Sequence, residues 1–188
     1  MFILEMSKMP LPLTLCRLAR KTIEAYINGE KFEPDKATKE KYKEKKACFV
    51  TLSINGRLRG CVGCLEAKKE LWKNVQENAI HAAFHDPRFM PLTKDELKEI
   101  KIEVSVLNVA KKLKFENEKD LLDKIDTNMG IILKRNFNSA TFLPQVWEEI
   151  PDKIDFLECL SRKAGLDKNA WKQPSTELWY YTVEVEEE

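Results

Sequence analysis

The feature that most constrains the fold of this chain is an alternating segment that ends in an Asn-Gly pair. From Ala47 to Ile54, apolar and polar residues alternate, which is the pattern of a β-strand with one buried face. Asn55-Gly56 follows at once, and this dipeptide is the strongest short-range signal for a two-residue hairpin turn. Residues Arg57 to Leu65 can then return as the second strand. The sequence therefore predicts an antiparallel hairpin.

Helical and extended patterns are mixed along the rest of the chain and do not alternate strictly. Apolar periodicity and capping residues predict helices at 14–28, 69–84, 118–125 and 152–165, and a short helix opened by the Thr93/Glu96 capping box. Extended patterns predict further strands at 102–106, 130–134, 140–143 and 178–185. Such a mixture predicts an α+β fold with a mainly antiparallel sheet and flanking helices.

The length and the net charge of the chain limit the number of its domains and the kind of partner it can bind. The 188 residues suit a single domain, 1–188, with room for a small lobe around 108–140. Residues 30–46 are dense in charge, and we interpret them as a solvated linker. Lysine and arginine total 32 against 31 acidic residues, which leaves a net charge of +1. A protein that binds the phosphate backbone usually carries a basic excess, so nucleic acid is not the expected partner.

The cysteines and the apolar stretches indicate the cellular compartment of the protein. The chain has 5 cysteines, an odd and scattered set that does not fit a secreted disulfide framework. No stretch approaches the length that spans a membrane, and the first residues do not read as a signal peptide. We therefore expect a cytoplasmic protein without a membrane partner.

Within the predicted hairpin, the register brings an arginine and a cysteine together. If the loop has two residues, Leu52 faces Arg59 and Val50 faces Cys61. Cross-strand partners share a face, so the guanidinium and the thiol would lie among apolar side chains. Burying a guanidinium is costly unless a carboxylate, a phosphate or a carbonyl group meets it.

Two interpretations of this arrangement follow. In the functional interpretation, Arg59 is an anion or carbonyl clamp that favours the thiolate form of Cys61. Gly60 and Gly63 would then leave the backbone open to a ligand. In the structural interpretation, Arg59 forms an internal salt bridge beside an inert core cysteine.

The same segment offers a possible metal site. Cys61 and Cys64 form a Cys-x-x-Cys, and His81 and His85 form a His-x3-His, which together approach the spacing of zinc ligands. In an extended strand, however, residues three apart point to opposite faces, so the two cysteines converge only if the strand breaks at Gly63. A thioredoxin-like site would need the pair to open a helix. We therefore predict no metal and no cofactor, with zinc as the alternative.

The hexapeptide Leu58–Gly63 closely resembles the signature of the AMMECR family. Further blocks resemble this family in the same order along nearly the whole chain: Phe49-Val50-Thr51-Leu52, Asp86-Pro87-Arg88-Phe89-x-Pro91-Leu92, Glu103-Val104-Ser105-Val106-Leu107, Phe142-Leu143-Pro144-Gln145-Val146 and Lys163-Ala164-Gly165-Leu166. The resemblance implies a two-lobed α+β fold with the signature near a cleft. It also implies Memo-like and radical S-adenosylmethionine proteins as partners in a modification pathway. Carried over by position, the candidate residues around such a cleft are Arg59, Cys61, Asp86, Arg88, Glu103 and Gln145.

Three hypotheses for the function result. In the first, Cys61 is a nucleophile or covalent carrier, with His85 or Glu103 as proton acceptor. In the second, the chain is a non-catalytic module that binds a protein or RNA through the cleft or the lysines of residues 41–46. In the third, the hexapeptide is purely structural and Arg59 ties the fold together.

Overall fold

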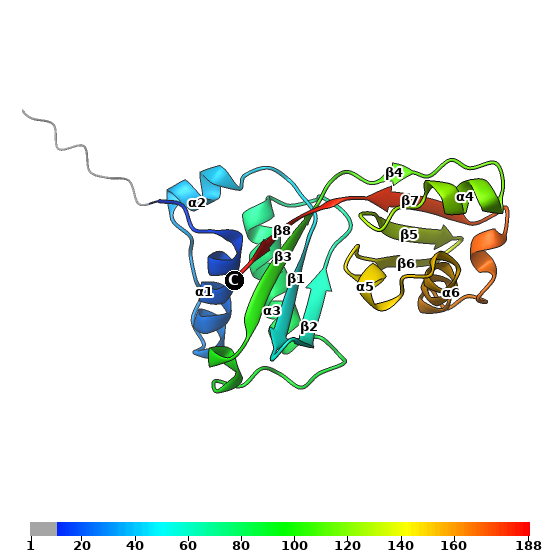
Figure 1. Cartoon of the computed structure of the whole chain (residues 1–188). Coiled ribbons are helices and arrows are strands. Elements are labelled where there is room, and N and C mark those ends of the chain that lie inside the picture. Colours follow the sequence, from blue (N-terminus) through cyan, green and yellow to red (C-terminus); the bar gives the residue numbers. More distant parts are fainter. Residues whose placement is uncertain (1–10) are drawn as a thin grey trace, which may run out of the picture. The chain divides into compact units, whose positions relative to one another are not determined.

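The structure is a computed structural model that describes residues 11–188, arranged in two compact units (Figure 1). The first unit takes in the described residues up to Val106 together with Val185–Glu188, and the second is Leu107–Glu184. Each unit has its own four-stranded sheet and its own hydrophobic core. Helices mixed with antiparallel strands confirm the predicted α+β class. The second unit begins near the start of the lobe expected at 108–140, and it runs on to Glu184.

The sheet of the first unit has the strand order β2-β1-β3-β8. Its strands are β1 (Cys48–Ile54), β2 (Arg57–Gly63), β3 (Lys101–Leu107) and β8 (Val183–Glu187). The predicted Asn55-Gly56 turn joins β1 to β2, and its two residues have φ values of 52° and 74°. Positive φ at both positions is what a type I′ hairpin turn requires. Strand β1 pairs antiparallel with β2 on one side and with β3 on the other.

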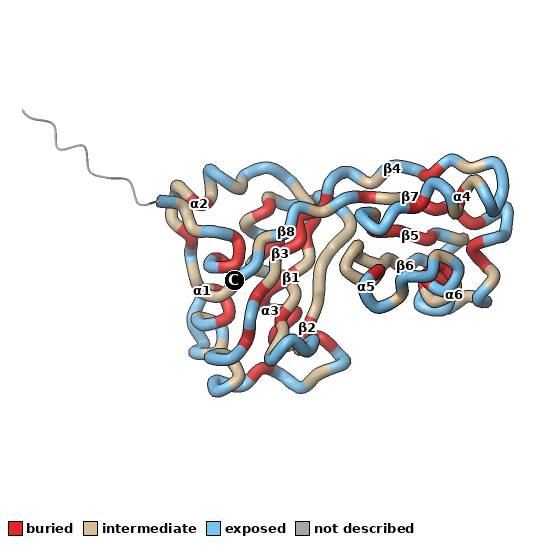
Figure 2. The backbone as a smooth tube through the Cα atoms, viewed as in Figure 1, coloured by how far each residue is buried: buried red, intermediate tan, exposed pale blue. Residues whose placement is uncertain are grey.

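Helices α1 (Leu15–Ile27) and α3 (Leu71–Phe84) form the second layer of this unit, at the positions that the sequence predicts. The Thr14 hydroxyl begins α1 by accepting a hydrogen bond from the Arg17 N–H at 3.2 Å. Both helices bury their apolar stripes against alternate residues of the strands. The centre of this core consists of Leu18, Ile23, Val50, Leu52, Val75, Ala79, Ile102 and Val104. Figure 2 shows the buried stretches of the first unit on these strands and helices.

Two predicted elements need correction. Residues 30–46 are not simply a solvated linker, because they contain α2 (Lys36–Lys41). The Asp35 side chain caps this helix by accepting from the Thr38 N–H at 2.7 Å, and Thr38 is fully buried. The strand expected at 178–185 is divided at Thr182 into β7 (Glu177–Tyr181) and β8. The Thr93/Glu96 capping box is present and opens the short 3-10 helix η1 (Glu96–Lys98).

The sheet of the second unit has the order β4-β7-β5-β6. Besides β7, its strands are β4 (Lys111–Lys112), β5 (Gly130–Arg135) and β6 (Asn138–Phe142). The helical elements of this unit are α4 (Glu118–Lys124), α5 (Val146–Glu149), α6 (Lys153–Lys163) and η2 (Ala170–Lys172). In its core the rings of Trp147 and Phe156 stack with centroids 3.6 Å apart. Among the helices of residues 11–188, none is both long and apolar enough to cross a membrane.

Candidate functional site

The pairing of β1 with β2 contains an irregularity that decides which way Cys61 points. Ser53 lies opposite Leu58, but Leu52 lies opposite Gly60, so Arg59 is an extra residue in β2. The prediction that Leu52 faces Arg59 and Val50 faces Cys61 is therefore wrong. A bulge adds one residue to one strand, and a shift of one residue turns every later side chain to the other face of the sheet.

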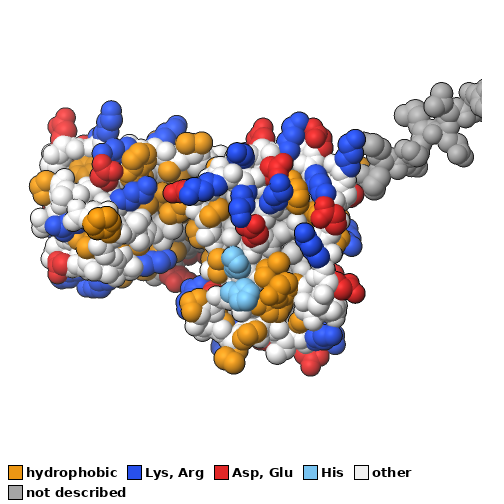
Figure 3. All heavy atoms as spheres, turned by 180° about the vertical axis from the view of Figure 1, so that it is seen from behind, with side chains coloured by type: hydrophobic (Ala, Val, Ile, Leu, Met, Phe, Trp, Pro, Cys, Tyr) orange, Lys and Arg blue, Asp and Glu red, His pale blue; other side chains and the backbone are white. Residues whose placement is uncertain are grey.

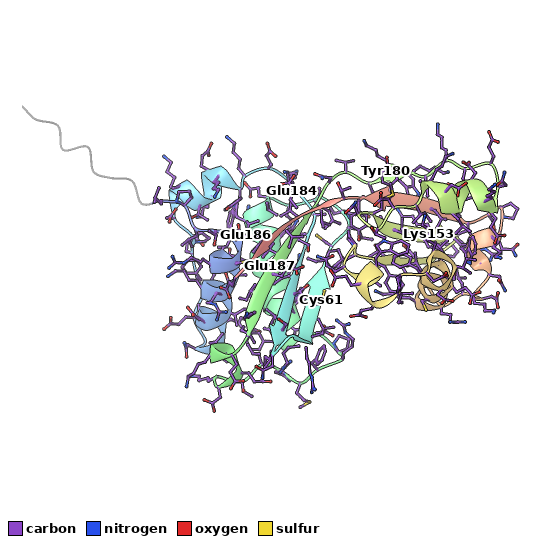
Figure 4. The ribbon with its side chains drawn as sticks, in the orientation of Figure 1. Cys61, Lys153, Tyr180, Glu184, Glu186 and Glu187 are labelled. Atoms are coloured by element: carbon purple, nitrogen blue, oxygen red, sulfur yellow. The ribbon has the colours of Figure 1, made fainter. Side chains whose placement is uncertain are left out.

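Because of the bulge, Cys61 belongs to a polar row that crosses three strands. Thr51 of β1 lies opposite Cys61 of β2 and also opposite Glu103 of β3, so the three residues share one face of the sheet. The Thr51 hydroxyl donates to the Cys61 Sγ at 3.3 Å. The Ser105 hydroxyl donates to Glu103 Oε1 at 2.9 Å. Figure 4 labels Cys61 on β2. A thiol, a hydroxyl and a carboxylate thus lie side by side across the three strands, on the face of the sheet opposite α1 and α3.

The backbone of Cys61 is held by the Asp-Pro-Arg turn that follows α3. Strand β2 is an edge strand, so alternate N–H and C=O groups point away from β1. Asp86 Oδ2 accepts from the Cys61 N–H at 2.9 Å, and Arg88 Nη2 donates to the Cys61 carbonyl at 3.2 Å. Asp86 and Arg88 therefore fix the position of the thiol by capping the strand edge on both sides of it.

The carboxyl group of Asp86 is strongly stabilised in its ionised form. It is only 4 % exposed and accepts from Arg88 Nε at 3.0 Å and from Arg88 Nη2 at 2.7 Å. These hydrogen bonds from Arg88, followed by those from the backbone N–H groups of Cys61 and Arg88, lower the pKa of Asp86 to about 2. The charge that anchors the Cys61 backbone is therefore kept at neutral pH.

Arg59 is met by a carboxylate of its own chain. Its Nε donates to Glu96 Oε1 at 2.7 Å and its Nη2 to Glu96 Oε2 at 3.1 Å, which is the two-point geometry of an arginine fork. The same Nη2 donates to the Met90 carbonyl at 2.8 Å, and the side chain is only 13 % exposed. Hydrogen bonding from Arg59, with a smaller contribution from Thr93, lowers the pKa of Glu96 to about 2. Arg59 therefore forms an internal salt bridge, as in the structural interpretation, and is not an open anion clamp.

The two glycines of the hexapeptide make room for the chain itself. A Cβ on Gly60 would lie 2.1 Å from the Ala82 carbonyl oxygen of α3. A Cβ on Gly63 would lie 2.3 Å from the ring of Phe49. The expectation that these glycines leave backbone open to a ligand is therefore corrected: they allow β2 to approach α3 and Phe49 closely.

Two further site residues were predicted, one at the end of α3 in the first unit and one in the second unit. The His85 ring is next to Tyr26 of α1, with 3.5 Å between Nε2 and the Tyr26 hydroxyl, and it contacts the ring of His81. Gln145 belongs to the second unit, where it precedes α5. Within residues 11–188, no group of three or more His, Cys, Asp and Glu residues could hold a metal ion, so the spacing of Cys61, Cys64, His81 and His85 does not become a zinc site.

The other cysteines differ from Cys61 in their surroundings. Cys16 and Cys48 are buried, and desolvation raises the pKa of each thiol to about 12, with the Glu186 carboxylate adding to the shift at Cys16. Cys61, Cys64 and Cys159 are partly exposed. Only these three thiols are therefore placed to react with a reagent from solution.

Comparisons with known proteins identify the family of this chain. A family model for AMMECR1 matches residues 16–186. The chain belongs to the AMMECR1 family. It is 38% identical over 179 residues to Protein NEQ441 of Nanoarchaeum equitans, a match that covers 94% of this chain and 99% of the relative. It is 42% identical to Protein MK0488 of Methanopyrus kandleri, covering 93% of this chain and 86% of the relative.

A solved structure agrees with this assignment. The crystal structure of the uncharacterized protein PH0010 from Pyrococcus horikoshii matches with a TM-score of 0.87 and 35% identity, over 93% of this chain and 89% of that chain. These matches cover far more than the hexapeptide, so the resemblance to the AMMECR family is confirmed over nearly the whole chain.

In this AMMECR1 chain, sequence reasoning missed Thr51 and the second role of Glu96. Thr51 had a visible signal, because it is a polar position in the alternating pattern of β1 and so lies on the non-core face. Glu96 was recognised only as a capping residue, since nothing in the sequence connects it to Arg59.

Proposed function

We propose that this AMMECR1 chain is a cytoplasmic, thiol-dependent or substrate-positioning component of a modification pathway, with Cys61 as the group that reacts or carries. The observation behind the proposal is the row formed by Cys61, Thr51 and Glu103. A hydroxyl that donates to sulfur stabilises the thiolate, which is the reactive form of cysteine. Glu103 lies on the same face, in β3 opposite Thr51, and is the proton acceptor in this proposal.

The surroundings of Cys61 support a fixed rather than a mobile thiol. Its N–H and C=O are bound by Asp86 and Arg88, so the backbone cannot shift without breaking charge-assisted hydrogen bonds. A group held by its backbone needs less reorganisation when a substrate arrives. In this proposal, Asp86 and Arg88 position the thiol. The Arg59–Glu96 pair stabilises the bulge that directs the Cys61 side chain to the face of the polar row.

The test is a pH series of iodoacetamide labelling, with the labelled cysteines mapped by mass spectrometry. Cys64 and Cys159 are internal controls because they are partly exposed like Cys61. We expect Cys61 to label at a lower pH than either control, and the preference to weaken in Arg88→Met, which removes the cation that donates to the Cys61 carbonyl. A Cys61 that labels no faster than Cys64 and Cys159 at any pH would refute an activated thiol.

For partners, we propose Memo-like and radical S-adenosylmethionine proteins, which the family resemblance suggests. Capture of purified candidates on the immobilised chain tests this, with Cys61→Ser alongside the wild type. Capture by the wild type that Cys61→Ser weakens supports a role of the thiol in the complex. Absence of capture by either form contradicts the proposed partnership.

RNA binding through the lysines of residues 41–46 gains no support from the contacts of that segment. Lys43 pairs with Glu40, and Lys46 lies 3.9 Å from Glu44. Two of the four lysines thus lie beside carboxylates, which lowers the number of counterions that the segment can release from a phosphate backbone. Between the two candidate functions, the polar row therefore favours the one that uses Cys61.

A further inference from the structure

The first unit contains a cavity in its helical layer, on the opposite side of the sheet from the Cys61 side chain. Its volume is about 840 Å³, and it lies between α1, α3 and the segment that follows α1. Three aromatic side chains line it: Tyr26 of α1, Phe32 of the connecting segment and Trp72 of α3. Cavities of this size and apolar character are typical of sites for small organic molecules.

One polar side chain of the cavity has a fixed orientation. The Gln76 Nε2 donates to the Phe32 carbonyl at 2.9 Å and to the Thr22 hydroxyl at 3.1 Å. A carbonyl oxygen can only accept, so this contact assigns the nitrogen of the amide without ambiguity. Gln76 Oε1 receives no hydrogen bond from any residue of 11–188. This oxygen is not fully buried, so a ligand can reach it. Gln76 therefore contributes to the cavity wall an amide of fixed orientation, with its oxygen left for a further donor.

The charged residues that line the cavity are of both signs, with Lys31 and Lys73 beside Glu30, Glu33 and Glu77. Glu33 pairs with Lys39, Glu77 with Lys69, and Lys73 with Glu70. Figure 3 shows, from behind, hydrophobic side chains gathered beside the two histidines and framed by side chains of both charges. Tyr26, whose ring contacts that of His85, connects this patch to the cavity. A rim with charges of both signs, three of which already form ion pairs, favours an uncharged ligand, because a charged one would compete with these pairs.

Each aromatic side chain of the cavity already has a neighbour within the first unit. Lys39 and Lys73 lie over the Trp72 ring, with 5.2 Å and 4.9 Å from Nζ to the centroid, so lysine chains already cover this ring. Lys21 Nζ lies 5.7 Å from the centroid of the Phe32 ring, and the Tyr26 ring packs against that of Phe84 with centroids 4.8 Å apart. Both rings also line the cavity. Offset or edge-on contact with such rings selects flat aromatic molecules.

We propose that this cavity binds a neutral, flat aromatic molecule whose N–H donates to Gln76 Oε1. The aromatic body packs against Tyr26 and Phe32, and the amide oxygen of Gln76 fixes its orientation. This site is independent of the thiol chemistry at Cys61, since its residues belong to the helical layer and Cys61 lies on the other face of the sheet.

Two probes of the same shape test the proposal: indole, which has the N–H, and benzofuran, in which oxygen replaces it. Binding is measured by chemical-shift titration of the full chain labelled with ¹⁵N. One neutral hydrogen bond corresponds to about fivefold in affinity, so we expect indole to bind about fivefold more tightly than benzofuran. Gln76→Met should remove this preference, and Ile80→Trp, which fills the cavity from α3, should abolish binding of both probes.

The comparison of probes in the wild-type chain does not depend on whether a variant folds. Equal affinities for indole and benzofuran would overturn the role of Gln76, and binding that survives in a folded Ile80→Trp variant would place the probe elsewhere. No saturable shift with indole up to its solubility limit would overturn the site itself.

Discussion

The Glu96 carboxylate fastens two segments of the first unit by accepting hydrogen bonds from both. One set comes from the Arg59 guanidinium on β2, and the other from the N–H and hydroxyl of Thr93, which begins the turn into η1. Asp86 does the same between β2 and Arg88. Both acids keep their ionised form because arginine hydrogen bonds lower their pKa values to about 2.

These two carboxylates predict acid sensitivity of the fold. The pKa of each is lowered in the folded state, so the stabilisation is complete above the unfolded values near 4 and is lost as the pH falls toward 2. We expect the free energy of unfolding, measured in urea, to fall by about 2 kcal/mol per group between pH of about 5 and 2. Glu96→Gln should lower stability at neutral pH and flatten this dependence. An unchanged pH profile in Glu96→Gln would contradict the role of the pair.

Thr51 allows a test of how the thiol is tuned. Thr51→Val removes the hydroxyl that lies 3.3 Å from the Cys61 Sγ and keeps the shape of the side chain. Without that donor the thiolate is less stable, so the pH midpoint of Cys61 alkylation should rise and its rate near pH 7 should fall several-fold. Thr51→Ser, which keeps a hydroxyl, should restore the rate. If Val and Ser behave alike, Thr51 acts through packing alone.

At the scale of elements, the close contact between β2 and α3 depends on a position without a side chain. Gly60 faces the Ala82 carbonyl so closely that a Cβ would lie 2.1 Å from the oxygen. The backbone of a helix cannot move aside as a flexible side chain can. The bulge that places Gly60 on this face is the same irregularity that turns Cys61 to the other face.

Gly60→Ala should therefore destabilise the first unit strongly. The expected loss is about 3 kcal/mol or more in the free energy of unfolding, because backbone has to shift to relieve the overlap. Gly56→Ala is the matched control: nothing lies within 4 Å of the added Cβ, and only the positive φ of 74° is unfavourable. That strain costs about 1 kcal/mol. Thermal or urea unfolding of both variants measures the difference, and equal losses would show that contact with α3 is unimportant.

The sequence predicts the elements of this region better than their register. Alternation and the Asn-Gly turn are local signals, and both strands form where they indicate. The bulge at Arg59 depends on the approach of α3 to Gly60 and on the Arg59–Glu96 pair, which are contacts between segments distant in sequence. Local patterns carry no information on such contacts. Residue types at the site could thus be identified, while the face on which Cys61 lies, and hence its contact with Thr51, could not.

At the scale of the whole molecule, residues 11–188 build two hydrophobic cores that share no buried residue. The first gathers around α1, α3 and the sheet of β1–β3, and the second around α6 and the sheet of β5–β7. In the second core, Trp147 stacks on Phe156 with an angle of 4° between the rings, and its Nε1 donates to the Met129 carbonyl at 2.8 Å. Each core is therefore held by its own contacts.

Separate cores predict that a cavity made in one unit loosens that unit most. Trp147→Ala removes the stacked ring and the hydrogen bond to Met129, and such a truncation costs about 3–5 kcal/mol. Hydrogen exchange followed by mass spectrometry should then accelerate mainly in peptides that cover β5 and β6. Leu52→Ala in the first core is the reciprocal variant, and it should accelerate exchange mainly in β1 and β3. Faster exchange of equal size in both sheets, in either variant, would mean that the two cores unfold as one cooperative unit.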